Sequence, residues 1–161
     1  MRIICTFAVL AALIAGPRAT AAVFTVTLTN DLVDVSPGDG VCDANPTAGV
    51  ACTLRAAVQE ANALAGDDAI SLPAGTYALT LSGLEDDAAA GDLDVTSGIT
   101  IEGDGAAVTG IGQTTADRVF EVWRSGDLML VDVTVSGGDP GTGLGSLGGG
   151  IRNAGLLALD A

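Results

Sequence analysis

The chain has 161 residues, of which 20 are acidic and six are basic, giving a formal net charge of −14. All six basic residues are arginine, and the sequence contains no histidine. Because a nucleic-acid-binding surface needs cations that neutralise phosphates, this composition excludes nucleic acid as a partner, and it disfavours anionic membrane surfaces.

The first 21 residues predict an export signal. Arg2 supplies a positive start, residues 3–15 are almost uninterruptedly apolar, and Ala19-Thr20-Ala21 has the small-x-small pattern that signal peptidase cleaves. The apolar run of about 13 residues is shorter than the roughly 20 that a membrane-spanning helix needs. We therefore expect residues 1–21 to be removed. We also expect a mature protein that is secreted or displayed at the cell surface, in the outer membrane or outside the cell, with no membrane span in this segment.

Residues 22–29 alternate apolar and polar side chains and predict a strand, which leads into a loop at 30–51 rich in Gly, Pro, Asp and Asn. Cys42 and Cys52 lie in and just after this loop. An even pair of cysteines in an exported chain predicts a structural disulfide. A metal site would need more ligands than two cysteines without histidine, and a nucleophilic cysteine would need a basic partner.

Residues 53–65 predict one short amphipathic helix. Thr53 is expected to cap its N-terminus and Gly66 to end it. Arg55, the one cation of the helix, is expected to make an ion pair or to bind backbone carbonyls. The apolar side chains follow the i, i+3, i+4, i+7 spacing of one helical face, at Leu54, Ala57, Val58, Ala61 and Leu64. We expect this face to cover the open end of the strands that follow.

Residues 69–161 predict short strands separated by glycine-containing turns. Val95, Val122 and Ile151 each precede such a turn, at spacings of 27 and 29 residues. A repeat of this length without further helices predicts an all-β right-handed parallel β-helix, that is, a solenoid. Residues 22–68 would form its disulfide-closed N-terminal cap, and the alternative fold is an antiparallel sandwich. Because the sequence stops inside a repeat, we expect it to be the N-terminal part of a longer protein.

Residues 52–57 (Cys-Thr-Leu-Arg-Ala-Ala) resemble the Cys-Ser-Leu-Arg-Glu-Ala signature of the CSLREA domain of exported bacterial proteins. The segments 38–42 (Gly-Asp-Gly-Val-Cys), 59–62 (Gln-Glu-Ala-Asn) and 72–77 (Leu-Pro-Ala-Gly-Thr-Tyr) extend the resemblance over about 24–77. It departs at Ala56, where the signature has a glutamate that would complete a capping box with Thr53. The resemblance implies a cap that leads into parallel β-helix repeats. Residues 148–153 are similar to repeats of polymorphic outer-membrane proteins, which are adhesin-like.

The leading functional hypothesis is a non-enzymatic, adhesin-like surface module without a cofactor, which contacts a glycan or protein outside the cell. The alternative is a calcium-dependent polysaccharide lyase of the pectate-lyase-like type, with Arg118 as base. Asp92 and Asp94 would share one face of a strand, and carboxylates are ligands that calcium prefers. The candidate calcium ligands are Asp92, Asp94, Asp104 and Asp117. The competing interpretation of these carboxylates is a solvated edge with no chemistry.

Overall fold

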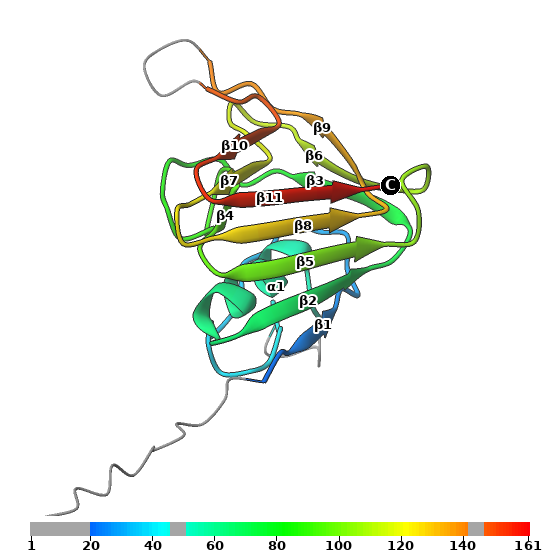
Figure 1. Ribbon diagram of the computed structural model, residues 1–161, viewed down its shortest axis with the longest axis vertical. Coiled ribbons are helices and arrows are strands. Elements are labelled where there is room, and N and C mark those ends of the chain that lie inside the picture. The colour runs from blue at the N-terminus through cyan, green and yellow to red at the C-terminus, as the bar shows by residue number, and fades with distance from the viewer. Residues whose placement is uncertain (1–19, 46–50, 142–146) are drawn as a thin grey trace, which may run out of the picture.

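The computed structural model describes residues 20–45, 51–141 and 147–161, and within these ranges it has eleven strands and one helix (Figure 1). The helix is α1 (Leu54–Ala63). The strands are β1 (Val23–Thr25), β2 (Asp67–Leu72), β3 (Gly75–Leu79), β4 (Leu93–Val95), β5 (Gly98–Gly103), β6 (Thr109–Gln113), β7 (Phe120–Val122), β8 (Asp127–Val131), β9 (Thr134–Gly137), β10 (Ile151–Asn153) and β11 (Leu156–Asp160).

The strands form three parallel sheets. A five-stranded sheet has the order β1-β2-β5-β8-β11, and two three-stranded sheets have the orders β10-β7-β4 and β3-β6-β9. Strands β1 and β2 pair directly, and from β2 onwards each strand enters a different sheet from the strand before it. Figure 1 shows the five-stranded sheet in front, with the two smaller sheets behind it and α1 beside β2 and β5.

The class predicted from the sequence, an all-β right-handed parallel β-helix, is wrong. The strands form three separate parallel sheets accompanied by a helix, and no closed or solenoid sheet is found among the described residues. The near-28-residue spacing misled because it marks the chain distance between neighbouring parallel strands. Any fold that pairs parallel strands through long crossover connections shows such a spacing. The alternative of an antiparallel sandwich is also wrong, since all described strand pairs are parallel.

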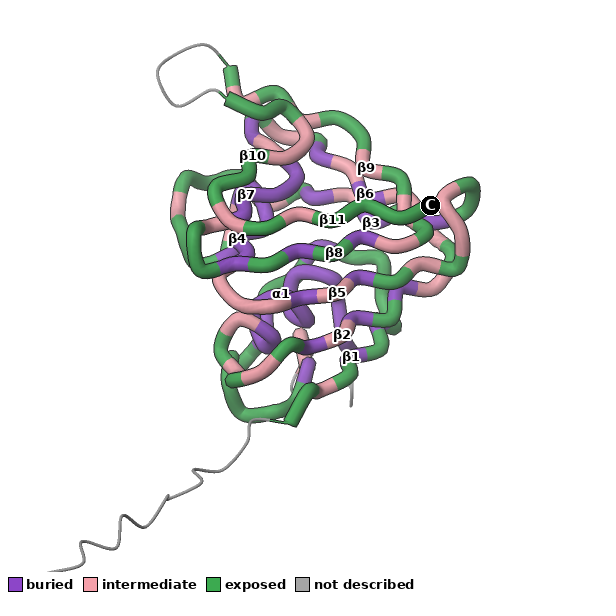
Figure 2. Tube along the Cα trace, viewed as in Figure 1, coloured by how far each residue is buried: buried purple, intermediate pink, exposed green. Residues whose placement is uncertain are grey.

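The register keeps like side chains together in the core. Ile70 pairs with Ile101, which pairs with Leu130, and these three side chains are at most 2% exposed. Buried and exposed positions alternate along the five-stranded sheet, as Figure 2 shows by colour. The predicted 27-residue step is confirmed, because Val95 pairs with Val122. The second step differs: Ile151 pairs with Phe120, two residues before the predicted partner.

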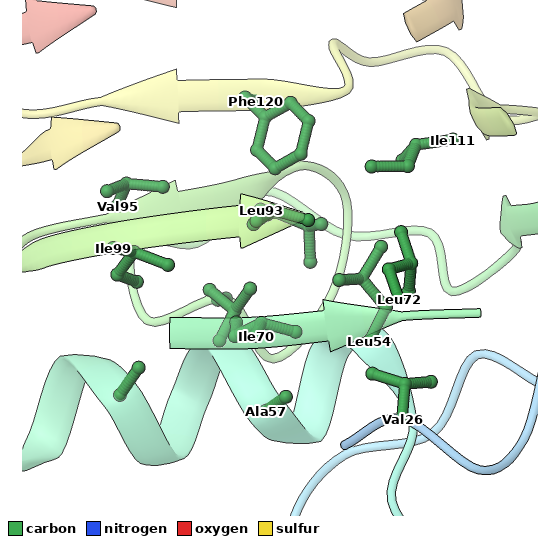
Figure 3. Close-up of a cluster of buried hydrophobic side chains, with 14 of the residues drawn as sticks. Val26, Leu54, Ala57, Ile70, Leu72, Leu93, Val95, Ile99, Ile111 and Phe120 are labelled. Atoms are coloured by element: carbon green, nitrogen blue, oxygen red, sulfur yellow. The ribbon is translucent and has the colours of Figure 1, made fainter. Parts of the chain in front are cut away.

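The predicted helix is confirmed and ends two residues earlier than expected. The Thr53 hydroxyl accepts a hydrogen bond from the Ala56 backbone N–H at 3.2 Å and so caps the N-terminus. Leu64 is already extended, and Gly66 has a φ of 132°. Leu54 and Ala57 point into the core shown in Figure 3. Ala56 is also fully buried, which accounts for a small apolar residue where the CSLREA signature has glutamate.

Candidate functional site

The disulfide predicted between Cys42 and Cys52 is confirmed. The two sulfur atoms are bonded, the Cα atoms are 5.0 Å apart, and both residues are buried. The bond joins the loop that follows β1 to the residue before the helix cap Thr53. It therefore fixes the loop that carries Cys42 to the start of α1.

Two polar side chains of α1 hold the preceding loop through its backbone. The Gln59 Oε1 accepts a hydrogen bond from the Asp34 N–H at 2.8 Å. The Glu60 carboxylate is fully buried and accepts hydrogen bonds from the N–H groups of Gly38, at 2.5 Å, and Gly40. Both glycines have positive φ, of 95° and 86°, a conformation that glycine adopts without strain. The segment 38–40 thus bends its amide groups around one carboxylate.

Asn62 forms hydrogen bonds with the backbone at the edge of the sheet β10-β7-β4. Its Nδ2 donates to the Asp94 carbonyl at 2.7 Å, and its Oδ1 accepts from the Thr96 N–H at 2.9 Å. Strand β4 is the edge strand of the order β10-β7-β4, so one of its sides has no strand partner. The side-chain amide supplies a donor and an acceptor there, as a neighbouring backbone would. Gln59, Glu60 and Asn62 of the segment 59–62 therefore all have structural roles.

Arg55 lies at the centre of a buried network. Its guanidinium is fully buried, and its Nε donates to the Asp31 carboxylate at 2.6 Å. Its terminal nitrogens donate to the backbone carbonyls of Ala88, Gly91 and Asp92 at 3.0, 2.9 and 3.2 Å. The predicted ion pair and carbonyl contacts of Arg55 are confirmed. The arginine anchors the loop that precedes β4.

The same network extends through Asp31 to the chain that leaves β3. The second carboxylate oxygen of Asp31 accepts from the backbone N–H groups of Thr80 and Leu81 at 2.6 and 2.9 Å. One carboxylate and one guanidinium therefore hold both ends of the segment 80–92, which we name the β3–β4 loop. These contacts satisfy backbone groups that no regular strand pairing would satisfy.

A pocket of about 240 Å³ lies between this loop and the connection before β7. We name it the acidic pocket, and its lining residues are Leu84, Glu85, Asp86, Asp92, Asp117, Arg118 and Glu121. Gly91 has a φ of 59°, and a Cβ there would collide with the Asp117 carboxylate and the Gly83 carbonyl. Glycine is therefore required at position 91 for the β3–β4 loop to pack closely against Asp117.

Arg118 is surrounded by carboxylates in the acidic pocket. Its NH1 nitrogen is 2.9 Å from Glu121, 3.5 Å from Asp92 and 3.9 Å from Asp117. Glu121 also pairs with Arg152. A guanidinium can donate several hydrogen bonds at once, and the three neighbouring carboxylates are acceptors of opposite charge. Arg118 is therefore placed to position the carboxylates or to contact an anionic group.

The pKa values of two aspartates are raised. Burial raises the pKa of Asp92 to about 7, and the charges of Asp94 and Asp117 add to this, against the opposing effect of Arg118. Burial raises the pKa of Asp94 to about 6, although hydrogen bonds from Trp123 and from the Ala88 backbone oppose the rise. Asp92 can therefore exchange a proton with a ligand near neutral pH.

The structure brings together Asp92, Asp117 and Arg118 of the residues considered for the lyase. Asp94 lies beside the pocket, but its carboxylate accepts from the Trp123 indole at 2.8 Å and the Ala88 N–H at 3.1 Å. Asp104 lies elsewhere, after β5, where it accepts from the Ala74 N–H at 3.0 Å.

Glu121 belongs to the pocket and was missed from the sequence. Strand register pairs Glu121 with Asp94, and Val95 with Val122. The 27-residue step found in the sequence therefore already placed a carboxylate at the position equivalent to Asp94. Applying that step to the residue before each valine would have found Glu121.

The described part of the chain contains neither a metal-binding cluster nor a membrane-spanning helix. Residues 20–45, 51–141 and 147–161 contain no group of three or more His, Cys, Asp or Glu side chains arranged to hold a metal ion. No helix within these ranges is long and apolar enough to cross a membrane. Most of the predicted export signal, residues 1–19, lies outside the described residues.

Comparison with family models, with curated proteins and with solved structures gives no match to this chain. The resemblance to the CSLREA domain stays a prediction that rests on the sequence segments themselves. The structure adds a physical role for several residues of those segments, since Arg55, Gln59, Glu60 and Asn62 all bind backbone groups.

Proposed function

We propose that this chain is an exported, non-enzymatic surface module of the adhesin-like, CSLREA type, which contacts a protein or glycan outside the cell. The observation that carries this proposal is that its buried polar side chains hold backbone groups of the protein itself. Arg55, Glu60 and Asn62 hold loops and a sheet edge through backbone groups. The Cys42–Cys52 disulfide supports the exported location, because disulfides persist in oxidising compartments.

The contact surface that we propose is the exposed middle of the β3–β4 loop. Leu84 is 92% exposed at its tip, and Asp86 and Asp87 are exposed beside it. The acidic pocket lies on one side of the loop. A second pocket of about 340 Å³ lies on the other, lined by Pro37, Gln59, Asn62, Ala63, Asp86, Asp87 and Thr96.

Internal hydrogen bonds hold this loop in one shape. The Glu85 carboxylate accepts from the N–H groups of Asp87 and Ala90 at 2.7 and 2.8 Å, and Arg55 anchors the end of the loop. A loop ordered before binding loses less entropy when a partner binds. Its acidic surroundings favour a partner surface with positive charge.

Binding of the purified chain to arrays of extracellular-matrix proteins and of neutral and anionic glycans tests this proposal, and we expect basic proteins to bind and anionic glycans to fail to bind. We expect binding that weakens as salt concentration rises and that is lost in the double variant Asp86→Asn, Asp87→Asn. The matched control is Asp127→Asn, an exposed carboxylate on the five-stranded sheet. Binding that survives the double variant unchanged would contradict the proposed surface.

The acidic pocket favours one second candidate, the calcium-dependent polysaccharide lyase. The supporting observation is the approach of Asp92, Asp117 and Arg118 together with the raised pKa of Asp92. Since no three acidic side chains of the described residues are arranged to hold a metal ion by themselves, calcium would have to be held jointly by pocket carboxylates and by the anionic polysaccharide. Release of unsaturated uronides from polygalacturonate, abolished by a chelator and by Arg118→Ala, would establish the lyase and replace the surface-module proposal.

A further inference from the structure

Asp68 is an isolated carboxylate in an apolar environment. It lies in β2 on the inward face of the five-stranded sheet and is 1% exposed. The inward positions beside it in the successive strands are Ile99, Leu128 and Leu157. Its Oδ2 atom is buried and has no hydrogen-bond partner. Burying a carboxylate without a positive partner is unfavourable, so this position calls for a cation.

The one hydrogen bond to Asp68 comes from the start of β1. The Ala22 backbone N–H donates to Asp68 Oδ1 at 2.7 Å. The Ala22 carbonyl accepts from the Ala69 N–H at 2.9 Å, which begins the pairing between β1 and β2. Ala22 is also the residue that directly follows the Ala19-Thr20-Ala21 cleavage pattern. The nitrogen that becomes the new N-terminus on cleavage is therefore already in contact with the isolated carboxylate.

We propose that Asp68 is the buried counter-ion for the N-terminal ammonium that signal peptidase creates at Ala22. In that step a water molecule is added across the Ala21–Ala22 peptide bond. Ala21 leaves as a carboxylate, and the Ala22 nitrogen takes a proton and becomes an ammonium with three N–H donors. The ammonium replaces one neutral donor by a charged group that can reach both oxygens of Asp68.

This ion pair couples maturation to folding. Before cleavage, Asp68 has one partner, and β1 is held on the edge of the five-stranded sheet by three register pairs. After cleavage, a charge-assisted contact joins the first residue of the chain to the inside of β2. The inference rests on the export proposed above, and it adds a role for the new N-terminus in the mature structure.

Amine labelling tests the ion pair with unusual selectivity. The sequence has no lysine, so the α-amine is the one primary amine that the processed chain carries. In the full chain, a factor Xa recognition sequence in place of residues 18–21 allows the bond before Ala22 to be cut after purification. A buried ion pair keeps the amine protonated and shielded. We expect labelling of the cut chain by an amine-reactive ester at pH 7.5 to be at least about tenfold slower than in Asp68→Asn.

Two further variants make the result specific. Asp67→Asn removes the exposed neighbouring carboxylate of the same strand, and it should keep the slow labelling. A chain cut before Ala21 instead of Ala22 keeps Asp68 and moves the amine one residue away from it, so its amine should label fast. This comparison remains available if Asp68→Asn does not fold. Cutting before Ala22 should also raise the melting temperature by at least about 4 °C, and Asp68→Asn should abolish that rise.

Equal labelling rates in the two cut chains, with the amine at Ala22 or at Ala21, would overturn the proposed ion pair. An unchanged melting temperature after cutting before Ala22 would overturn it as well. The mass of chain recovered from the exported fraction reports separately on the proposed export. Recovery of the full 161 residues would contradict export with cleavage, whereas the engineered cut tests Asp68 whatever that mass shows.

Discussion

The Arg55–Asp31 network and the acidic pocket each combine an arginine with carboxylates. They differ in how completely the charged groups are matched by partners of opposite charge or by hydrogen bonds. Arg55 is fully buried, and its donors meet one carboxylate and three backbone carbonyls. The Arg118 side chain is 12% exposed at the edge of an open pocket and faces three carboxylates. In the first region every group has a fixed partner. In the second, like charges crowd together and one aspartate has a pKa of about 7.

This difference separates a structural ion pair from a site that can respond to a ligand. The two regions are adjacent, because the Asp92 carbonyl binds Arg55 while the Asp92 carboxylate lines the acidic pocket. The Arg55 network therefore fixes the backbone from which the pocket is built. Disturbing the network should affect the pocket, whereas changes in the pocket should leave the network intact.

The largest expected effect comes from Arg55→Met. Removing the guanidinium leaves the Asp31 charge buried without a cation, and we expect a loss of about 3–5 kcal/mol in the free energy of unfolding. Arg118→Met should cost less, about 1–3 kcal/mol, because water and a proton on Asp92 can partly compensate the carboxylates that lose their cation at this pocket. Arg124→Met, at an exposed position, is the matched control and should change nothing beyond about 0.5 kcal/mol. Urea unfolding of the three variants measures these losses in the free energy of unfolding. Equal losses for Arg55→Met and Arg118→Met would contradict the difference between the two regions.

The disulfide should have the next largest effect. Replacing Cys52 by serine removes the link between the loop before α1 and the helix start, with an expected cost of about 3 kcal/mol. Intact-mass measurement after alkylation of the oxidised protein should find neither Cys42 nor Cys52 alkylated. Alkylation of both without prior reduction would contradict the bond.

The pH dependence of stability should arise in and beside the acidic pocket, where Asp92 and Asp94 have raised pKa values and Asp92 has the larger rise. The pKa of Asp92 is raised from 3.8 to about 7, so the folded state binds more protons than the unfolded state between these values. The free energy of unfolding should therefore fall as pH rises from about 4 to about 7. Asp92→Asn should reduce this fall by an amount on the order of 2 kcal/mol. Chemical denaturation at several pH values measures it, and an unchanged slope in the variant would place the titration elsewhere.

The smallest of these effects should come from Asn62. Asn62→Ala removes both contacts with the edge strand β4 and leaves the Asp94 carbonyl and the Thr96 N–H without partners. We expect a cost of about 1 kcal/mol, together with faster hydrogen exchange at Thr96. If exchange of the Thr96 N–H stays as slow as in the unaltered protein, the Asn62 side chain does not take the place of a neighbouring strand.

The local features could be predicted from the sequence because their causes are local. The Thr53 cap, the spacing of apolar residues on α1 and the even cysteine pair each follow from neighbouring residues. The 27-residue step also gave the pairing of Val95 with Val122. The sheet arrangement did not follow, because a repeat fixes the distance between parallel partners without fixing how their sheets are joined.

Parts of the candidate site escaped prediction for a related reason. Asp31 is 24 residues from Arg55 and 49 from Thr80, so its role depends on three segments that only the fold brings together. Glu60 gave no sign that it would bind Gly38 and Gly40, since its charge indicated an exposed helix face. Asp68 likewise sits in an alternating strand pattern that does not reveal which face carries the charge.

Hydrogen exchange at loop amides tests the central claim most directly, namely that the polar side chains of this chain serve its structure. Gly38, Gly40, Thr80 and Leu81 lie outside the helix and strands, and their N–H groups donate to Glu60 or Asp31. We predict that these four amides exchange as slowly as those of β5, and that Glu60→Ala frees the two glycines while leaving Thr80 and Leu81 protected. Exchange of all four at the rate of open loops in the unaltered protein would contradict the account.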